Sequence, residues 1–263
     1  MAETGETRDS PIEVVTVPCL RDNYAYLVRD RASGLVALVD APEAAPIQAA
    51  LDARGWSLAQ IWITHHHADH TDAVAALRAG GAEVIGHGAD AHRLPPLDRA
   101  VAEGERIALG ETEARVLDVS GHTVGHIAFV LDRPHAAFTA DSLMALGCGR
   151  VFEGTMAMMW ASLSKLAALP DDTAIYSGHN YGVANARFAL SIEPRNAALQ
   201  ARLAGIEAAN AAARPIVPAT LAEERATNPF LRATEPAVAA AVGLPDAPAA
   251  EVFAEVRRRK DSF

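Results

Sequence analysis

The sequence predicts an α/β fold followed by a helical C-terminal region, and two observations support this expectation. Before Tyr181-Gly182, short β-branched runs alternate with helical stretches, whereas alanine-rich stretches with helical spacing follow it. The chain has 263 residues, 50% of them hydrophobic, so it is globular and long enough for one large core or two domains. We therefore expect one domain over residues 1–182 and an α-helical domain over residues 183–263.

The first region contains the predicted strands and two short helices. Apolar runs typical of strands occupy residues 35–39, 59–64, 83–86, 114–119, 136–138 and 174–176. Helical spacing occurs at residues 72–78, where Gly80-Gly81 ends the helix, and at residues 162–169, before Pro170. In the second region, helices are predicted at residues 184–190, 195–213, 221–224 and 252–259.

Four potential metal ligands lie in the segment that follows the apolar run Ile61-Trp62-Ile63. The pattern H-x-H-x-D-H comprises His65, His67, Asp69 and His70. Because side chains alternate along a strand, His65, His67 and Asp69 share one face, and His66 points to the other. His70 follows where the chain should turn into the next helix. Imidazole and carboxylate groups at this density can hold two metals rather than one, although three adjacent histidines also arise by chance.

Three further strand ends carry residues of the same kinds. In Ser120-Gly121-His122, glycine permits a tight turn that can aim the imidazole of His122 back at a site. Asp141 follows the run 136–138, and His179 follows the run 174–176. Taken singly, Asp141 is typical of a turn or cap, and His179 of an ordinary loop. Together, the four segments supply five histidines and two aspartates, which suits two metals that share a carboxylate.

These segments resemble the metallo-β-lactamase superfamily and, within it, the hydroxyacylglutathione hydrolases, or glyoxalase II enzymes. The resemblance implies a four-layer αββα sandwich with a C-terminal helical domain. The implied ligands are His65, His67 and His122 for the first metal, and Asp69, His70 and His179 for the second. Asp141 corresponds to the carboxylate that bridges the two metals, whereas His66 and His126 correspond to no ligand.

Three more stretches carry the resemblance: residues 20–27, 147–155 and 256–261. They are similar to the family's opening strand, its substrate-side loop and a C-terminal segment that grips glutathione. The implied substrate-binding residues are Arg150, Phe152, Tyr181, Arg257 and Lys260. Arg150 stands where some members carry lysine, and Phe152, which offers no hydroxyl, where some carry tyrosine. Arg257 and Lys260 share one helical face, but the helix dipole alone also favours basic residues at a helix end.

The resemblance implies hydrolysis of S-(2-hydroxyacyl)glutathione, chiefly S-D-lactoylglutathione, to glutathione and D-lactate. The implied cofactors are two divalent metal ions per chain, with zinc expected first and iron or manganese as alternatives. Such a metal pair lowers the pKa of a shared water, and Asp69 is expected to act catalytically by orienting that nucleophile and taking its proton. The alternative function is that of a persulfide dioxygenase, which uses a single iron, or of another hydrolase with the same fold.

Composition narrows the possible partners and locations. The net charge of −10 argues against sequence-independent binding to nucleic acid. No apolar run approaches the ~18 residues of a membrane span, and residues 1–10 lack the apolar core of a signal peptide. Cys19 and Cys148 form no C-x-x-C pair, so we expect a reducing, cytoplasmic location, and we also expect a monomer. Cys148 is interpreted as a small residue in a tight turn rather than as a nucleophile.

Overall fold

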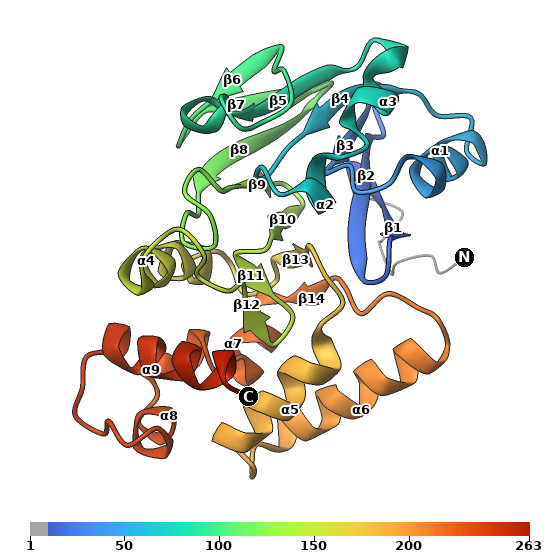
Figure 1. Ribbon diagram of the computed structural model, residues 1–263. Coiled ribbons are helices and arrows are strands. Elements are labelled where there is room, and N and C mark those ends of the chain that lie inside the picture. The colour runs from blue at the N-terminus through green and yellow to red at the C-terminus, as the bar shows by residue number, and fades with distance from the viewer. Residues whose placement is uncertain (1–9) are drawn as a thin grey trace. The chain divides into compact units, whose positions relative to one another are not determined.

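The computed structural model describes residues 10–263, which form two compact units (Figure 1). The first unit runs to Asp118 and also contains Gly125–Ala140, whereas the second contains Val119–Val124 and Asp141–Phe263. The domain boundary expected between residues 182 and 183 stays a prediction. The expectation that residues 1–10 lack the apolar core of a signal peptide falls almost entirely on residues 1–9. These lie outside the described residues.

Two β-sheets dominate the first unit. Its strands are β1 (Ile12–Cys19), β2 (Asn23–Asp30), β3 (Val36–Val39), β4 (Leu58–Trp62), β5 (Glu83–His87), β6 (Arg99–Val101), β7 (Arg106–Leu109), β8 (Thr112–Asp118), β9 (Ile127–Asp132) and β10 (His135–Ala140). Its helices are α1 (Ala44–Asp52), α2 (Ala68–Thr71) and α3 (Val74–Leu77), with the 3₁₀ turns η1 (Arg78–Gly80) and η2 (Gly88–Asp90). In the first sheet, β1 to β3 are antiparallel and β3 to β6 parallel. Strands β7 to β10 form an antiparallel meander.

Apolar side chains pack against both faces of the first sheet. Between the two sheets, the rings of Tyr26 and Phe138 have centroids 5.5 Å apart, and those of Trp62 and Phe129 are 5.1 Å apart. On the opposite face, Leu38 belongs to a buried cluster that includes the apolar sides of α1 and α3. The first unit is therefore layered as helix, sheet and sheet, because a largely parallel sheet must be covered on both faces.

The second unit is mainly helical. Its helices are α4 (Met156–Ala167), α5 (Gly182–Ile192), α6 (Ala197–Ala211), α7 (Leu221–Thr227), α8 (Pro236–Ala241) and α9 (Ala249–Asp261), with the 3₁₀ turn η3 (Leu231–Thr234). Strand β11 (Leu143–Met144) pairs with β12 (Gly147–Cys148), and β13 (Ala174–Ser177) pairs with β14 (Ala219–Thr220), both antiparallel. The alanine-rich helices α5 and α6 pack on each other through Ala186, Ala189, Leu199 and Ile206. Small side chains allow such helix backbones to approach closely.

Two predicted element boundaries differ from the structure for local reasons. The strand predicted over residues 59–64 ends at Trp62, because the Thr64 N–H bonds the Asp40 carboxylate at 2.9 Å instead of a neighbouring strand. Asp69 consequently lies in α2, and its predicted place on the strand is wrong. The helix predicted at residues 162–169 already begins at Met156, because the Thr155 hydroxyl accepts a hydrogen bond from the Met158 N–H at 3.1 Å and caps it.

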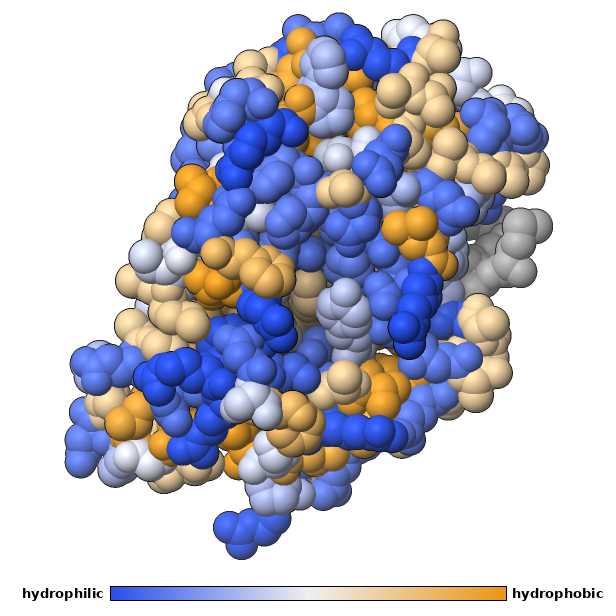
Figure 2. Space-filling model, in the orientation of Figure 1, coloured by the Kyte–Doolittle hydropathy of each residue, from blue (hydrophilic) through white to orange (hydrophobic). Residues whose placement is uncertain are grey.

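The surface carries hydrophobic side chains in small patches. On the face shown in Figure 2, such patches lie among hydrophilic side chains. Among the described residues, the most exposed large hydrophobic side chains are Phe263, Phe152 and Leu20. Within residues 10–263, no helix combines the length and the hydrophobicity that crossing a bilayer requires.

Candidate metal centre

The H-x-H-x-D-H segment brings its four predicted ligands together within the first unit. An extended stretch leads from β4 to α2, and this stretch carries His65 and His67. His65 Nε2 lies 3.1 Å from His67 Nδ1, and His70 Nε2 lies 3.9 Å from Asp69 Oδ2. His65 and His70 are both fully buried, and their ring centroids are 4.3 Å apart. The three imidazoles and the carboxylate of this segment therefore lie close to one another.

A buried carboxylate at the end of β3 orients two of these imidazoles. Asp40 Oδ2 accepts hydrogen bonds from His70 Nδ1 and from the Thr64 hydroxyl, both at 2.8 Å. Because the Thr64 hydroxyl donates to Asp40, its oxygen can accept from His65 Nδ1, which lies 3.0 Å away. Both rings therefore carry a proton on Nδ1 and keep the lone pair of Nε2 for a metal.

Asp40 and Asn23 are supporting residues that sequence reasoning did not single out. Asn23 donates its side-chain N–H to Asp69 Oδ2 at 3.0 Å and to the Asp69 carbonyl at 2.9 Å, so it holds the carboxylate in place. In the sequence, Asp40 could have been recognised as an acidic residue directly after an apolar strand. Its left-handed backbone, with φ of 56°, is uncommon outside glycine and is evident only in the folded chain.

The two histidines that matched no ligand have other contacts. His66 Nδ1 lies 3.0 Å from Asp90 Oδ2, and the other oxygen of this carboxylate accepts from Arg93 Nε. The His126 ring is fully buried and stacks on His65, with centroids 4.6 Å apart and planes within 14°. His66 therefore pairs with an acid of η2, and His126 packs against an imidazole of the ligand segment.

A second set of predicted ligands converges within the second unit. Asp141 Oδ2 lies 3.4 Å from His122 Nε2 and 3.3 Å from His179 Nε2. All three side chains are at least nine-tenths buried. One carboxylate oxygen thus faces two imidazole nitrogens that come from separate segments of the chain.

A backbone carbonyl orients His122 in this second set. His122 Nδ1 lies 2.7 Å from the carbonyl oxygen of Arg150, which can only accept, so the proton is on Nδ1. Nε2, on the side of Asp141, keeps its lone pair. Gly149 makes this approach possible, because an added Cβ would stand 2.1 Å from the Asp141 carbonyl oxygen and 2.9 Å from His122 Nδ1.

The donor chemistry of both sets fits a divalent transition metal. Each of the seven side chains offers one ligand atom, a nitrogen from histidine or an oxygen from aspartate. Imidazole combined with carboxylate suits zinc, iron and manganese. The hydrogen-bond partners of the Nδ1 atoms of His65, His70 and His122 leave Nε2 of each ring for a metal.

The predicted substrate-side aromatic residues lie against ligands of the second set. The Phe152 ring has its centroid 5.3 Å from that of His122, and the Tyr181 ring stacks on His179 at 4.8 Å. Both aromatic side chains are substantially exposed, whereas the two imidazoles are buried. Each aromatic ring therefore covers one imidazole and presents an accessible surface beside it.

Two of the three basic substrate-side residues, Arg150 and Arg257, are connected through one carboxylate of α9. Asp261 Oδ1 accepts from Arg257 Nη2 at 2.8 Å and lies 3.4 Å from Arg150 Nε. Arg257 is only 4% exposed and also donates to the Cys148 carbonyl at 2.9 Å, so it is already engaged within the protein. Lys260 donates to the Ala184 carbonyl at 3.3 Å, and burial together with the Arg257 charge lowers its pKa.

The environment of Cys148 argues against a nucleophilic role. Its thiol is buried beside Arg257, and burial raises the pKa to about 11. The thiolate is the reactive form of cysteine, so this side chain is protonated and unreactive at neutral pH.

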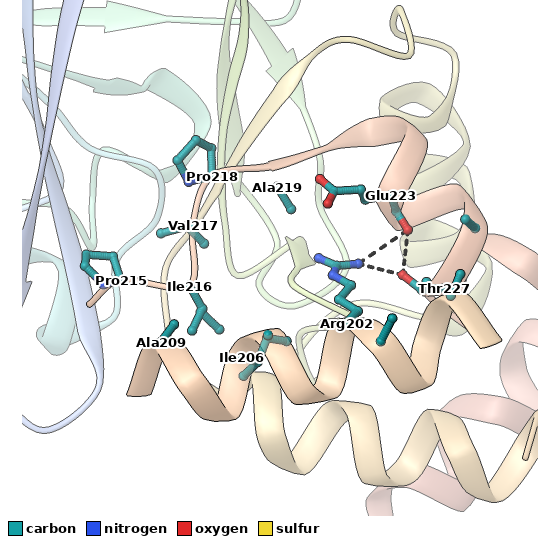
Figure 3. Close-up of a pocket in the computed structure, with 14 residues that line it drawn as sticks. Arg202, Ile206, Ala209, Pro215, Ile216, Val217, Pro218, Ala219, Glu223 and Thr227 are labelled. Carbon is teal, nitrogen blue, oxygen red and sulfur yellow. Dashed lines mark hydrogen bonds between the residues drawn. The ribbon is translucent and has the colours of Figure 1, made fainter. Parts of the chain in front are cut away.

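A separate cavity lies in the second unit beside α6 and α7 (Figure 3). Its volume is about 610 Å³, and most of its lining is apolar, including Ile206 and Pro215. Arg202, Glu223 and Thr227 supply its polar groups. None of the fourteen residues drawn around it is a predicted ligand or substrate residue.

Two family models divide the chain between them. Residues 20–179 match the metallo-β-lactamase superfamily, and residues 180–263 match the hydroxyacylglutathione hydrolase C-terminus. The crystal structure of the BLEG-1 B3 metallo-β-lactamase matches with a TM-score of 0.64 at 20% identity, covering 83% of this chain and 99% of that chain. Fold and donor set therefore define a member of the metallo-β-lactamase superfamily.

Similar proteins cover almost the entire chain. A hydroxyacylglutathione hydrolase of Ruegeria pomeroyi is 64% identical over 96% of this chain and 100% of the relative. A protein of the same name from Cereibacter sphaeroides is 62% identical, with the same coverage of both chains. The chain therefore belongs to the hydroxyacylglutathione hydrolase family. The predicted α/β metallo-β-lactamase fold with a helical C-terminal region is confirmed, and the histidine and aspartate sets indicate divalent-metal binding.

Proposed function

We propose that this protein hydrolyses S-(2-hydroxyacyl)glutathione, chiefly S-D-lactoylglutathione, to glutathione and D-lactate. The relatives at 62% and 64% identity carry the name of this activity. The observation that carries the proposal is the pair of ligand sets, in which the Nδ1 atoms of His65, His70 and His122 form hydrogen bonds that orient these imidazoles. Such preset imidazoles are typical of a metal centre rather than of histidines that merely fill a core.

In this proposal the two sets together hold two divalent metals, zinc first, with iron or manganese as alternatives. The first metal is assigned to His65, His67 and His122, and the second to Asp69, His70 and His179. Asp141 is assigned as the shared carboxylate. Its distances of 3.4 and 3.3 Å from one histidine of each triad support this role. A set of histidine and aspartate ligands that shares one carboxylate also leaves positions for water and substrate, as a catalytic metal site requires.

When bound, the metals supply Lewis acidity, which polarises the thioester carbonyl and makes hydroxide available near neutral pH. Asp69 is the residue assigned to orient the attacking water and accept its proton. Asn23 supports this role, because its two hydrogen bonds hold the Asp69 carboxylate in one orientation. The leaving thiol has an ordinary pKa near 8.5, so the sulfur departs largely as thiolate and no strong general acid is needed.

We assign the substrate side to Arg150, Phe152, Tyr181, Arg257 and Lys260. Phe152 and Tyr181 support this by presenting exposed rings beside His122 and His179. Arg150 and Lys260 offer cations for the glutathione carboxylates. Arg257 adds a positive charge, and it also holds the Cys148 carbonyl and Asp261 in place.

The direct test is turnover of S-D-lactoylglutathione by the purified protein, measured together with its metal content. We expect release of D-lactate and glutathione, about two divalent metals per chain, and loss of activity after chelation that added zinc restores. Protein that holds two metals and leaves the thioester intact would refute the proposal. Oxygen consumption with glutathione persulfide, with no thioester hydrolysis, would favour the dioxygenase alternative.

A second test separates recognition of glutathione from metal chemistry. Lys260→Ala should raise KM for glutathione thioesters by about tenfold, which is the value of one charge-assisted contact. A small thioester without the glutathione portion should be hydrolysed as by the wild type. Arg258→Ala is a matched control, because Arg258 is also a cation of α9 but points to solvent and pairs with Glu255. Equal effects of the two substitutions, or equal losses with both substrates, would contradict the assignment.

We also propose a monomeric protein in the cytoplasm that acts without nucleic acid or membrane. The net charge of −10 supports the exclusion of nucleic acid. Sedimentation of the purified protein at several concentrations tests the monomer, and a concentration-dependent increase in mass would contradict it.

A further inference from the structure

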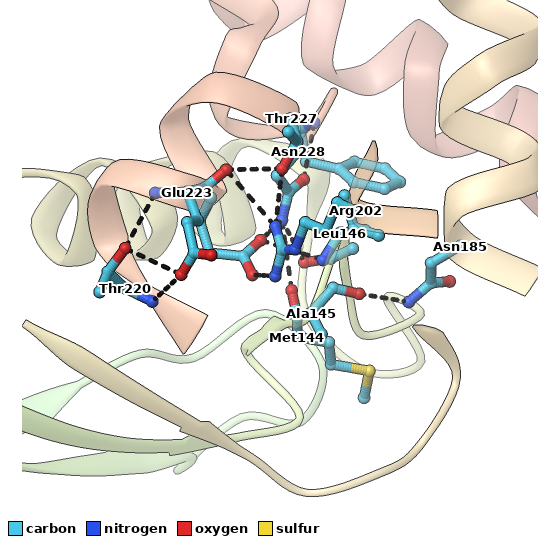
Figure 4. Close-up of polar contacts among 12 residues, drawn as sticks. Met144, Ala145, Leu146, Asn185, Arg202, Thr220, Glu223, Thr227 and Asn228 are labelled. Atoms are coloured by element: carbon cyan, nitrogen blue, oxygen red, sulfur yellow. Dashed lines mark hydrogen bonds and ion pairs between the residues drawn. The ribbon is translucent and has the colours of Figure 1, made fainter. Parts of the chain in front are cut away.

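A fully buried carboxylate, that of Glu224, holds the turn of a short hairpin in the second unit. Figure 4 shows Leu146, Arg202 and Asn228, whose polar groups lie near one another. Glu224 on α7 has an exposed fraction of 0% and forms an ion pair with Arg202 of α6. Its Oε2 also accepts the Leu146 N–H at 3.0 Å and the Asn228 side-chain N–H at 2.9 Å. A buried charge is stable only when it is paired and hydrogen-bonded, and all of these contacts meet that need.

Asn228 forms hydrogen bonds with both strands of the same hairpin. Its side-chain N–H groups reach the carbonyl of Met144 at the end of β11 at 3.2 Å and that of Gly147 at the start of β12 at 2.9 Å. Leu146 lies between these strands with φ of 60°, a conformation that is uncommon for a leucine. Glu224 and Asn228 together therefore hold a turn that the local sequence does not favour.

The base of this hairpin is part of the second ligand set. The Gly149 N–H bonds the Asp141 carbonyl at 3.0 Å, which closes the hairpin next to the proposed bridging carboxylate. The next residue, Arg150, accepts the hydrogen bond from His122 Nδ1 at 2.7 Å. A displacement of residues 143–148 would therefore move both Asp141 and the carbonyl that orients His122.

We propose that Glu224 is a positioning residue for the proposed metal centre, acting with Arg202 and Asn228 through the β11–β12 hairpin. This inference rests on the proposed function for the identity of Asp141 and His122 as ligands. In this proposal Glu224 takes no part in the reaction itself. It affects the positions of Asp141 and His122 through the backbone of residues 141–150. The route from α7 to the ligands consists of contacts within the second unit only.

Glu224→Gln is the test, because it preserves the shape of the side chain and removes the charge that three donors share. Substituting a residue that supports a metal ligand reduces metal affinity or activity about 10- to 100-fold, so we expect kcat and the affinity for added zinc to fall by that factor. KM for the glutathione thioester should change less than kcat, since Lys260 lies on α9, outside residues 141–150. The cobalt-substituted protein should show an altered visible spectrum, and amide hydrogen exchange over residues 141–150 should become faster.

Glu223→Gln is the matched control, because Glu223 is the neighbouring residue on α7 and closes a capping box with Thr220 without touching the hairpin. It should leave kcat, metal affinity, the cobalt spectrum and exchange over residues 141–150 at wild-type values. If Glu224→Gln does not fold, because Arg202 has lost its partner, the double variant Glu224→Gln with Arg202→Met removes that charge and is measured in the same way.

The proposal is overturned if Glu224→Gln, or the double variant, equals Glu223→Gln in metal affinity, cobalt spectrum and hydrogen exchange, even when its melting temperature falls. Failure of the proposed function has a different signature. Wild-type protein would then bind no metal or hydrolyse no thioester, while the exchange comparison would still decide whether Glu224 holds the hairpin.

Discussion

The two ligand sets are oriented by different kinds of group. In the first unit, the imidazoles of His65 and His70 depend on the side chain of Asp40, directly or through Thr64. In the second unit, His122 depends on a peptide carbonyl, that of Arg150. Both kinds of partner fix the ring and raise its basicity, but only the carboxylate adds a negative charge. The first set should therefore respond to side-chain substitution and the second to changes in the path of the backbone.

The largest effect is expected at the carboxylate assigned to both metals. Asp141→Ala should leave a folded protein with reduced metal content, because one oxygen faces histidines of both proposed triads. Lewis acidity contributes several kcal/mol to such reactions, so kcat/KM should fall by roughly a thousandfold or more. Metal analysis and thioester turnover measure this. Two metals and full turnover in the variant would refute the bridging role, and Asp141→Cys should shift metal preference toward softer ions.

Two adjacent histidines of the H-x-H-x-D-H segment, one a predicted ligand and one not, should differ in their effects. His67→Ala should remove the first metal and abolish hydrolysis, since His67 Nδ1 lies 3.1 Å from His65 Nε2. His66→Ala removes the contact to Asp90 but no predicted ligand, and it should retain both metals with at most a modest change in rate. Metal content and kcat of the two variants provide the measurement. Similar losses in both would mean that the two neighbouring side chains do not have separate roles.

A pair of conservative substitutions tests the contrast between side-chain and backbone support. Asp40→Asn should weaken zinc binding by about 10- to 100-fold, because it removes the charged partner of the His70 imidazole. Gly149→Ala should have an effect of similar size at the second set, because its Cβ would meet the Asp141 carbonyl oxygen at 2.1 Å.

Competition with a chelator measures both affinities. Gly205→Ala is the control for Gly149→Ala, since nothing lies within 4 Å of an added Cβ there. If Gly149→Ala behaves like Gly205→Ala, the backbone path does not control the second set.

The smallest expected effect concerns pH and Lys260. Burial and the Arg257 charge lower the Lys260 pKa, so this cation loses its proton at a lower pH than an ordinary lysine. KM for glutathione thioesters should therefore rise on the alkaline side, by no more than about tenfold, while the charge is lost. Lys260→Arg stays protonated and should show a flat KM over the same range. If KM rises in the same way in Lys260→Arg, a group other than Lys260 causes the rise.

Cations on α9 illustrate why spacing alone could not describe the substrate side. The i, i+3 spacing of Arg257 and Lys260 predicted one shared helical face, and both lie on α9. Their environments nevertheless differ, since Arg257 is 4% exposed and bonded to the Cys148 carbonyl and to Asp261. Which side chains surround a helix face depends on segments far away in sequence, and no periodicity contains that information.

The sequence by itself determined the fold class, the family and the part of the candidate site whose ligands are close together in sequence. The H-x-H-x-D-H pattern was readable because its ligands are close in sequence, so local geometry alone keeps them near each other. The alternation argument still placed Asp69 wrongly, because the strand ends at Trp62 when the Thr64 N–H turns to Asp40.

Only the tertiary structure decided which groups orient the ligands. Asp40 reaches Thr64 and His70 because β3 and β4 run parallel, with Val39 paired to Trp62, so the two strand ends lie side by side. Likewise, Glu224 and the Leu146 turn are distant in sequence and meet only when α7 packs in the second unit. A hydrogen bond requires its partners within about 3 Å, and for residues far apart in the chain that condition is set by packing, not by local sequence.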